Sequence, residues 1–400
     1  MSSYILNDFI NIVDTEHILV LYDTQPKSLT TNFHPKYKYI NESLREYLHN
    51  IKKEIDNKVD KWEKYKKYSN TYEFINTNFL YKDNYATVCA YKPISRSFYK
   101  MVEILNSNDF SFDKQKIKSF HLAEGPGGFI EALLKIRKNK NDTYYGMTLM
   151  EDHNDIPRWK KAAAFLSQNK NVKLVYGPRG DGNLYLKHNL LYIYENYFHN
   201  IDFITADGGF DFSTDFNAQE ESSLNLIVCE VLYAIIMQKK GGSFVLKVFD
   251  CFSNVMMEIL YLLCYLYDEV SFTKPCTSRS ANSEKYVICK GFRMVDNIDA
   301  IIKKIGNNFI NMKDNQIMKI LNIEISDFFK NKLEEMNYLF GQQQIENISH
   351  TLNLINDNVD GERLERIKNQ NIYKCTKWCR KHNMPINSII NDNSDHNLQN

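Results

Sequence analysis

The sequence lacks an excess of charge of either sign and lacks any hydrophobic segment long enough to cross a bilayer. Its 400 residues contain 50 Lys and Arg against 49 Asp and Glu, so no overall field attracts nucleic acid, and an RNA partner would require a local basic groove. The longest apolar run, around residues 255–266, is too short for a membrane span and contains Glu258. The first residues do not show the basic-then-apolar pattern of a signal peptide. We therefore expect a soluble, intracellular protein, in the cytoplasm or nucleus, with no membrane partner.

Paired cysteines are also missing. The 8 cysteines are scattered, no CxxC motif occurs, and several lie within apolar runs, where cysteine acts as a small core residue. Cys375 and Cys379 lie one helical turn apart, but no histidine pair accompanies them at the spacing of a zinc site. The pattern is typical of a reducing compartment and predicts no metal site.

The most distinctive stretch is a glycine-rich turn. An apolar run at residues 120–123 ends in an acid, and three glycines and a proline separate it from a second apolar segment. The turn and its borders are Glu124, Gly125, Pro126, Gly127, Gly128 and Phe129. Glycine lets a backbone approach a ligand closely, and N–H groups at the start of the next helix would face an acceptor. The spacing is neither GxGxxG nor GxxxxGK[ST], so the stretch indicates a nucleotide-type cradle, with an ordinary strand-to-helix turn as the alternative.

Between residues 118 and 293 the hydrophobic pattern alternates between strands and helices. We expect strands at residues 120–123, 143–149, 172–176, 201–206, 243–248, 269–273 and 286–290. We expect helices at residues 97–105, 129–138, 157–168, 222–239 and 254–267. Apolar strands separated by helices of this length predict an α/β fold with a seven-stranded, mostly parallel sheet covered on both faces. Ligands of such sheets bind beyond the carboxyl ends of the strands.

The two flanks differ from this central pattern. Residues 1–85 are mixed, with a strand at residues 17–22 and an amphipathic helix at residues 44–68, whose charges form a solvated face or, alternatively, grip RNA. Residues 296–400 are predicted to be helical without strands, and the end is expected to fray. The helices expected there include residues 317–329, 333–340 and 361–382. The sequence therefore predicts a central domain at residues 86–295 with a helical addition on each side.

Four charged residues lie where such a sheet would hold a ligand. Asp207 follows the fourth predicted strand, Lys247 lies inside the fifth, Glu284 precedes the last, and Lys100 lies on the helix before the glycine turn. Each has an ordinary alternative: Asp207 as a turn residue, Lys247 at a sheet edge, and Glu284 and Lys100 at the surface. A buried lysine is costly unless it is paired. When two lysines and two acids lie at the same end of one sheet, each of these ordinary explanations becomes less convincing than it is for one residue alone.

Together these features resemble the FtsJ-type ribose 2′-O-methyltransferases. The resemblance covers about residues 90–295 and includes the glycine turn, Asp207-Gly208-Gly209 and Lys247. Residues 271–291, Met147-Thr148-Leu149 and Gln219-Glu220-Glu221 most resemble the branch that methylates the first transcribed nucleotide of capped mRNA. The resemblance implies a Rossmann-like methyltransferase fold, and it does not separate a nuclear host enzyme from that of a large DNA virus.

The resemblance also implies site residues. The family's Lys-Asp-Lys-Glu tetrad corresponds to Lys100, Asp207, Lys247 and Glu284. S-adenosylmethionine would bind at the turn through Glu124, Gly125, Pro126, Gly127, Gly128 and Phe129, with Asp207 facing the methyl donor. Asp181 is a further candidate, for the adenine edge. The acid that commonly holds the cofactor ribose is not evident, because residues 148–151 occupy its place.

This assignment has a simple chemical interpretation. A ribose hydroxyl must lose its proton, and lysine is normally protonated near neutrality. We expect burial and the nearby cation of Lys100 to lower the pKa of Lys247, so that Lys247 acts as the base. Asp207 and Glu284 would orient the two ammonium groups, and no metal is required.

The implied substrate is the 5′ end of capped mRNA, with other capping enzymes or RNA polymerase as further partners. Two alternatives remain: methylation of rRNA or tRNA, and a catalytically inert RNA-binding or assembly module of the same fold. Trp159 and Tyr185 could stack on a methylated guanine or could belong to the core.

Overall fold

The computed structural model describes residues 2–6, 13–22, 37–81, 83–110, 112, 116–150, 158–209, 217–309 and 315–391. Three features of the sequence analysis lie outside these residues: Glu151, Pro157 at the start of an expected helix, and the tail from residue 392 to 400.

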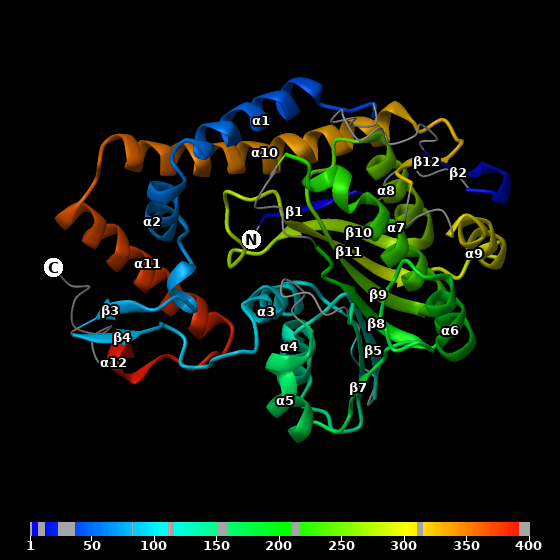
Figure 1. Cartoon of the computed structure of the whole chain (residues 1–400), viewed down its shortest axis with the longest axis horizontal. Coiled ribbons are helices and arrows are strands. Elements are labelled where there is room, and N and C mark those ends of the chain that lie inside the picture. The colour runs from blue at the N-terminus through cyan, green and yellow to red at the C-terminus, as the bar shows by residue number, and fades with distance from the viewer. Residues whose placement is uncertain are drawn as a thin grey trace.

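The central element is a twisted sheet of eight strands (Figure 1). The strands lie in the order β1 (Ser2–Ile5), β10 (Tyr267–Lys274), β11 (Lys285–Phe292), β9 (Gln238–Val248), β8 (Ile201–Ala206), β5 (Lys118–Leu122), β6 (Thr143–Met147) and β7 (Val172–Leu174). The pairs from β9 to β7 are parallel, and β11, β10 and β1 are antiparallel to their neighbours. All seven predicted strands are confirmed, and β1 adds an eighth at the edge.

Helices cover both faces of this sheet. The helices α3 (Ser97–Ser107), α4 (Gly128–Arg137) and α5 (Ala163–Gln168) share one hydrophobic cluster with one face. The helices α6 (Lys187–Tyr197), α7 (Gln219–Met237), α8 (Asn254–Leu266) and α9 (Ile298–Asn307) share another cluster with the other face. Because strand side chains alternate, Phe244 and Leu246 of β9 point into the second cluster and Val245 into the first.

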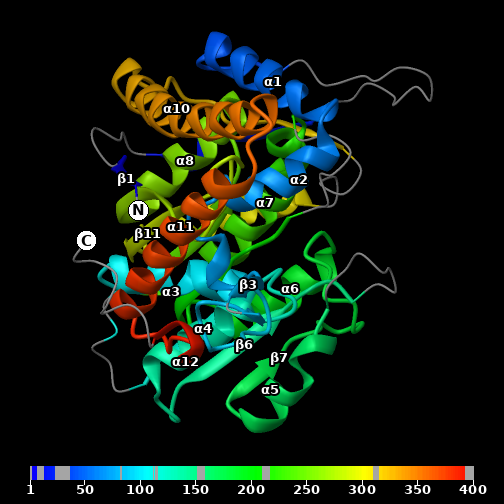
Figure 2. The same ribbon diagram turned by 90° about the vertical axis from the view of Figure 1, so that its left-hand side faces the viewer.

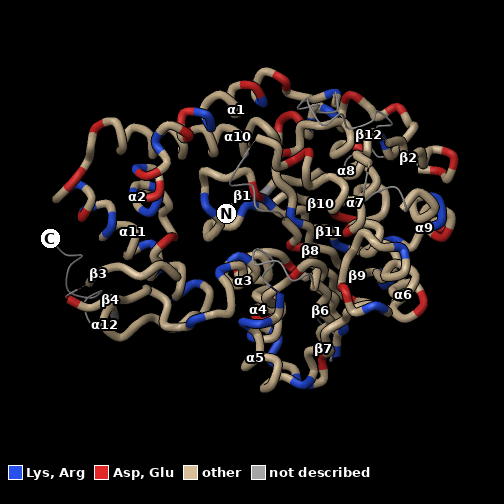
Figure 3. Tube along the Cα trace, in the orientation of Figure 1, with Lys and Arg blue, Asp and Glu red and all other residues tan. Residues whose placement is uncertain are grey.

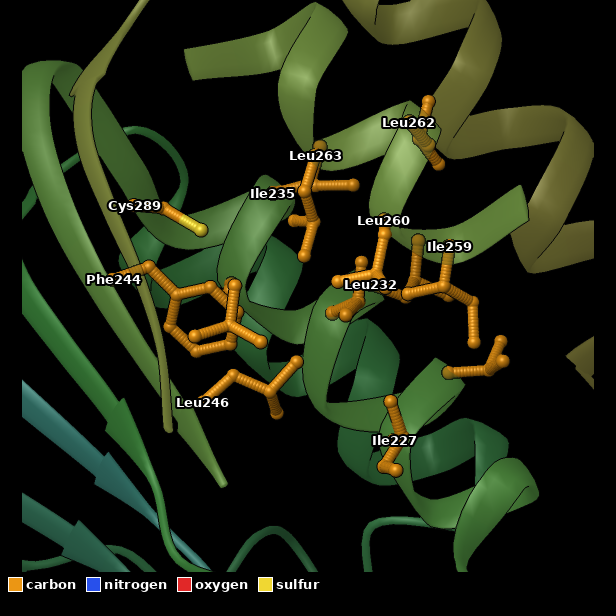
Figure 4. Packing of buried hydrophobic residues seen from close by; sticks show 14 of the residues in the cluster. Ile227, Leu232, Ile235, Phe244, Leu246, Ile259, Leu260, Leu262, Leu263 and Cys289 are labelled. Atoms are coloured by element: carbon orange, nitrogen blue, oxygen red, sulfur yellow. The ribbon is translucent and has the colours of Figure 1, made fainter. Parts of the chain in front are cut away.

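The second cluster is the larger core. Figure 4 shows Leu232 and Ile235 of α7 and Leu260 of α8 packed near Phe244 of β9. Burial of each such side chain stabilises the fold by about 1.5–3 kcal/mol. Both helices are apolar on most sides, which is typical of helices enclosed in a protein interior. Helix α8 begins where the Ser253 hydroxyl caps the N–H of Met256. Helix α6 was not predicted, because its mixture of leucine, isoleucine and tyrosine has no clear helical period.

Helices from the two flanks pack against one another. The expected helix at residues 44–68 is interrupted at Asn57 and Lys58, giving α1 (Glu42–Asp56) and α2 (Val59–Ser69). These helices pack on α10 (Asp327–Asn356) and α11 (Gly361–Lys381) through small apolar clusters, one of which joins Ile51 to Ile348. Figure 2 shows α11 passing α2 and continuing to α3. Charges of both signs are interspersed along these helices (Figure 3).

One expectation for the C-terminal flank was wrong. Residues 317–329 were expected to be helical and residues beyond 295 to contain no strand, but Ile317–Leu321 forms strand β12, which pairs with β2 (Ile18–Tyr22). The buried carboxylate of Glu258 accepts the N–H groups of Ile320 and Leu321 at 2.6 and 2.9 Å. Strand β2 and Glu258 are both distant from β12 in the sequence, so the local pattern could not predict this strand. The strand expected at residues 17–22 is confirmed as β2.

The remaining short elements complete the flanks. They are the hairpin strands β3 (Phe79–Tyr81) and β4 (Asn84–Ala86), the terminal helix α12 (Ser388–Asn391), and the 3₁₀ helices η1 (Thr15–His17) and η2 (Glu73–Ile75). A third 3₁₀ helix, η3 (Lys160–Ala162), directly precedes α5 in the central region. No helix within the described ranges combines the length and apolarity that a bilayer span requires.

All eight cysteines are free, and Cys375 and Cys379 are buried.

Candidate active site

The candidate site lies where the strand order of the sheet reverses direction. Strands β5 and β8 are neighbours in the sheet. Strands β6 and β7 follow on the β5 side, and β9 follows on the β8 side. Leu122 pairs with Ala206, so the glycine turn and Asp207 emerge side by side at the carboxyl edge. Ala206 also pairs with Leu246, which places Lys247 beside Asp207. This switch point is where open α/β sheets bind ligands.

The glycine turn allows α4 to approach α3 closely. Gly127 has a φ of +111°, in the region that favours glycine. A Cβ atom on Gly128 would lie 2.3 Å from the hydroxyl oxygens of Ser95 and Ser97, at the start of α3. The turn therefore fixes the distance between the candidate cofactor site and the helix that carries Lys100.

Glu124 is the chemically unusual residue of this turn. Its carboxyl group is buried, and Oε1 accepts the N–H of Phe129 at 2.5 Å, whereas Oε2 has no hydrogen-bond partner. Burial, together with the nearby charge of Asp207, raises the pKa of Glu124 well above its usual value. An unpartnered buried carboxyl oxygen beside a second carboxylate fits a ligand that brings hydrogen-bond donors and positive charge.

The four tetrad residues meet above the carboxyl edge as two ion pairs. Lys100 Nζ lies 2.7 Å from Glu284 Oε1, and Lys247 Nζ lies 3.4 Å from Asp207 Oδ1. Lys247 Nζ also donates to the Asp207 carbonyl oxygen at 2.7 Å. The four side chains are 10–14% exposed, so the pairs are shielded but remain accessible from one side. The structure thus brings together all four residues that the sequence singled out.

The protonation of the tetrad differs from the expectation for Lys247. Burial alone would lower the pKa of this lysine, but Asp207, Glu284 and Glu230 outweigh burial and raise it. Burial alone would likewise raise the pKa of Glu284, but Lys100 and Lys247 lower it to about 2. The expectation that Lys247 has a lowered pKa was therefore wrong, because three acids surround it and Lys100 is paired with Glu284.

Four residues that sequence reasoning missed support the tetrad. Tyr286 donates its hydroxyl to Asp207 Oδ1 at 3.1 Å, and Ser278 donates to Glu284 Oε1 at 2.8 Å. Lys274 is buried and donates to the carbonyl oxygens of Asn282 and Glu284 at 2.8 and 2.6 Å. The pattern Ser-x-x-x-x-x-Glu-x-Tyr before the last strand was visible in the sequence, but the direction of each side chain was not.

Glu230 is the fourth of these residues and lies beneath the Asp207 turn. It belongs to the apolar helix α7 and accepts the N–H of Gly208 at 3.2 Å. A Cβ atom on Gly208 would lie 2.2 Å from its carboxyl oxygen. Burial raises the pKa of Glu230 to about 8, although Lys247 opposes this shift. Glu230 is the single charged residue among residues 222–237, which was a signal in the sequence, but only the tertiary structure shows that it lies beneath Asp207.

The remaining residues that the sequence singled out are Asp181, Trp159 and Tyr185. Asp181 accepts the N–H of Asn183 at 2.8 Å and pairs with His188 at 2.9 Å. Its backbone oxygen accepts the N–H of Met150, so the loop with Asp181 lies beside the end of β6. Trp159 is buried against Gly127 and Gly146, so it is a core residue and is not open for stacking on a base. Tyr185 is partly buried against the larger core.

The chain is similar to one protein family and to several proteins of known function. The profile of FtsJ-like methyltransferases matches residues 93–292, half of the chain. The chain is 27% identical over 348 residues to cap-specific mRNA (nucleoside-2′-O-)-methyltransferase 2 of Danio rerio, covering 80% of this chain and 44% of that protein. It is 36% identical over 202 residues to cap-specific mRNA (nucleoside-2′-O-)-methyltransferase 1 of Mus musculus, covering 48% of this chain and 23% of that protein. The chain thus spans less than half of these two relatives.

Among solved structures, a ribosomal RNA methyltransferase from Plasmodium falciparum is 20% identical. The alignment covers 50% of this chain and 97% of that one, with a TM-score of 0.34.

Proposed function

Because the chain belongs to the FtsJ-like methyltransferase family, we propose that it methylates the ribose 2′-hydroxyl of the first transcribed nucleotide of capped mRNA. FtsJ-like methyltransferases use S-adenosylmethionine as the methyl donor. The observation that carries the proposal is the pair of lysine–carboxylate contacts, at 2.7 and 3.4 Å, beside the glycine turn. The relatives named for cap-specific mRNA methylation support capped mRNA as the substrate. We propose residues 86–295 as the catalytic domain, with the additions serving this substrate.

The tetrad residues have distinct proposed roles. Lys247 takes the proton of the 2′-hydroxyl, which requires its amine to be neutral at the moment of reaction. Asp207 orients Lys247, and Glu284 orients Lys100, whose ammonium group adds positive charge near the hydroxyl oxygen as it becomes an anion. Holding the hydroxyl in place supplies much of the rate.

The methyl donor is proposed to bind at the glycine turn. Glu124 and the N–H groups that open α4 would hold it, with Asp181 at the outer end and Asp207 at the inner end. When bound, S-adenosylmethionine supplies an electrophilic methyl group on a positively charged sulfur. This positive charge near Asp207 would offset the carboxylate that now raises the pKa of Lys247.

The Glu124→Gln variant tests the cofactor site. We expect the affinity for S-adenosylmethionine to fall about 10- to 100-fold, because the N–H of Phe129 needs the single side-chain oxygen of glutamine. This leaves an NH2 group, a donor, in the place of the acceptor Oε2. Isothermal titration calorimetry measures this loss. The matched control is Glu131→Gln, a buried acid on α4 that instead accepts the N–H of Ile94, and it should stay within about twofold. Equal affinities in both variants would contradict the placement of the donor.

The pH dependence of the reaction tests the role of Lys247. Because the surrounding acids raise the pKa of Lys247, most Lys247 side chains are protonated at neutral pH, and the neutral, reactive fraction grows as pH rises. We expect the single-turnover rate to rise about tenfold per pH unit through the neutral range before it levels off. A flat profile in single turnovers limited by the chemical step would contradict a protonated lysine as the resting state of the base.

The proposed function itself is tested with labelled methyl donor and short RNAs. Capped RNA should be methylated, uncapped RNA of the same sequence should react far more slowly, and mapping should place the label on the first nucleotide. A deoxyribose at that nucleotide should abolish the reaction. Equal labelling of uncapped rRNA or tRNA fragments would favour the alternative substrates, and failure to bind S-adenosylmethionine would favour an inert module.

A further inference from the structure

Glu103 lies on the same helix as Lys100, three residues later. It is 2% exposed. Its carboxylate accepts the N–H groups of Cys276 and Thr277 at 2.7 and 2.8 Å, at the start of the loop that leads to Glu284. It also accepts the indole N–H of Trp378, on α11, at 2.9 Å. One buried carboxylate therefore joins the Lys100 helix, the Glu284 loop and the C-terminal addition.

Glu73 makes a second junction from the N-terminal addition. Its carboxylate, on η2, pairs with Arg96 at 3.0 Å and with Arg279 at 3.3 Å. Arg96 immediately precedes α3, and Arg279 lies in the Glu284 loop. Burial alone would raise the pKa of Glu73, but the two guanidinium groups lower it to about 2. Glu73 is thus charged at neutral pH, and charge-assisted contacts of this kind are among the strong hydrogen bonds of proteins.

The additions reach the same loop at further points. On α10, Gln344 donates to the carbonyl oxygen of Ala281 at 3.0 Å. The side chain of Trp378 packs against Tyr99 with ring centres 5.7 Å apart and belongs to the same hydrophobic cluster as Phe98. Lys100 and Glu284 are therefore both carried by segments that the flanking helices hold.

We propose that the N- and C-terminal additions position the Lys100–Glu284 half of the site through two buried carboxylates, Glu73 and Glu103. The proposal rests on the proposed methyl transfer. Glu73 and Glu103 are positioning residues, because neither contacts the place where the hydroxyl or the methyl donor would lie. The Lys247–Asp207 half is carried by β9 and by the end of β8, and none of the contacts of Glu73 and Glu103 given above is with either of these two residues.

The test compares Glu103→Gln and Trp378→Phe with Glu258→Gln in the full chain. Glu258 on α8 is a matched control, since it is also a buried acid that accepts two consecutive backbone N–H groups. Its donors are Ile320 and Leu321 on β12, which do not belong to the Glu284 loop. We expect kcat for methylation of capped RNA to fall about 10- to 100-fold in the first two variants, because misplacement of a catalytic group by about 1 Å costs this much. The affinity for S-adenosylmethionine should be unchanged in all three.

Two further readouts separate positioning from general destabilisation. Amide hydrogen exchange of residues 275–284 should accelerate in Glu103→Gln and Trp378→Phe, but not in Glu258→Gln. The double variant Glu103→Gln/Trp378→Phe should lose no more kcat than Glu103→Gln alone, because Trp378 acts through Glu103. Rates and exchange equal to the parent chain in either single variant, or equal losses in Glu258→Gln, would overturn the proposal.

The exchange measurement also keeps this proposal separate from the proposed function. If the parent chain methylates no RNA, the proposed function fails. Faster exchange at residues 275–284 in the two variants would still support the positioning role of the additions, and unchanged exchange would overturn it.

Discussion

Replacement of Lys247 by methionine is expected to reduce methyl transfer about 10³- to 10⁴-fold while S-adenosylmethionine still binds. Methionine keeps much of the side-chain volume but removes the amine, so no base remains to take the hydroxyl proton. It also leaves the carboxylate of Asp207, whose side chain is only 14% exposed, without its cationic partner. Single-turnover measurements with saturating RNA and labelled donor would show the loss, and calorimetry would show the unchanged binding.

A second lysine on the same strand provides the control. Lys239 is half-exposed and lies 3.7 Å from Asp202, at the opposite end of β9. Lys239→Met should therefore leave the rate within about twofold, because exposed ion pairs contribute little. Turnover of Lys247→Met within tenfold of the parent chain would exclude Lys247 as the base.

Replacement of Asp207 by asparagine is expected to have the second-largest effect, a fall in kcat of about 10³-fold. Asp207 is the strongest of the acids that raise the pKa of Lys247, and it orients that lysine. Asparagine keeps the shape but removes the charge, so Lys247 is left beside a neutral amide, and a preorganised charge next to the donor is lost. With this acid removed, the pH–rate curve should move to lower pH even as its plateau falls.

Tyr286→Phe is the matched control for this variant. It removes only the hydroxyl that donates to Asp207 Oδ1 at 3.1 Å and leaves every charge in place. We expect a loss of less than about tenfold, consistent with one neutral hydrogen bond to a charged group. A curve for Asp207→Asn that keeps the parent midpoint would show that Asp207 does not set the pKa of Lys247.

The sheet and the positions of Asp207 and Lys247 at its carboxyl edge were predictable because their signals are local. Apolar runs of strand length marked β5 through β11, and a charged residue at the end of such a run, like Asp207 after β8, marks the carboxyl edge. Lys247 was conspicuous because a lysine interrupts a buried strand. Parallel pairing then brings strand ends together, so the meeting of Asp207 and Lys247 followed from the topology.

The features that sequence reasoning missed depend on contacts between distant segments. Strand β12 forms because β2 and Glu258 satisfy its backbone, and both are remote in sequence. The raised pKa of Lys247 depends on Glu230, whose position in an apolar helix gives no hint that it lies beneath Asp207. The roles of Glu73 and Glu103 depend on α3 and the Glu284 loop meeting helices from both ends of the chain.

The most direct test of the account is a crystal structure with S-adenosylhomocysteine and a short capped RNA. We predict that the 2′-oxygen of the first transcribed nucleotide lies within hydrogen-bonding distance of Lys247 Nζ, about 3 Å, with the ligand sulfur beside the glycine turn. A ribose bound away from Lys247, or a ligand bound away from Glu124 and Asp207, would contradict it.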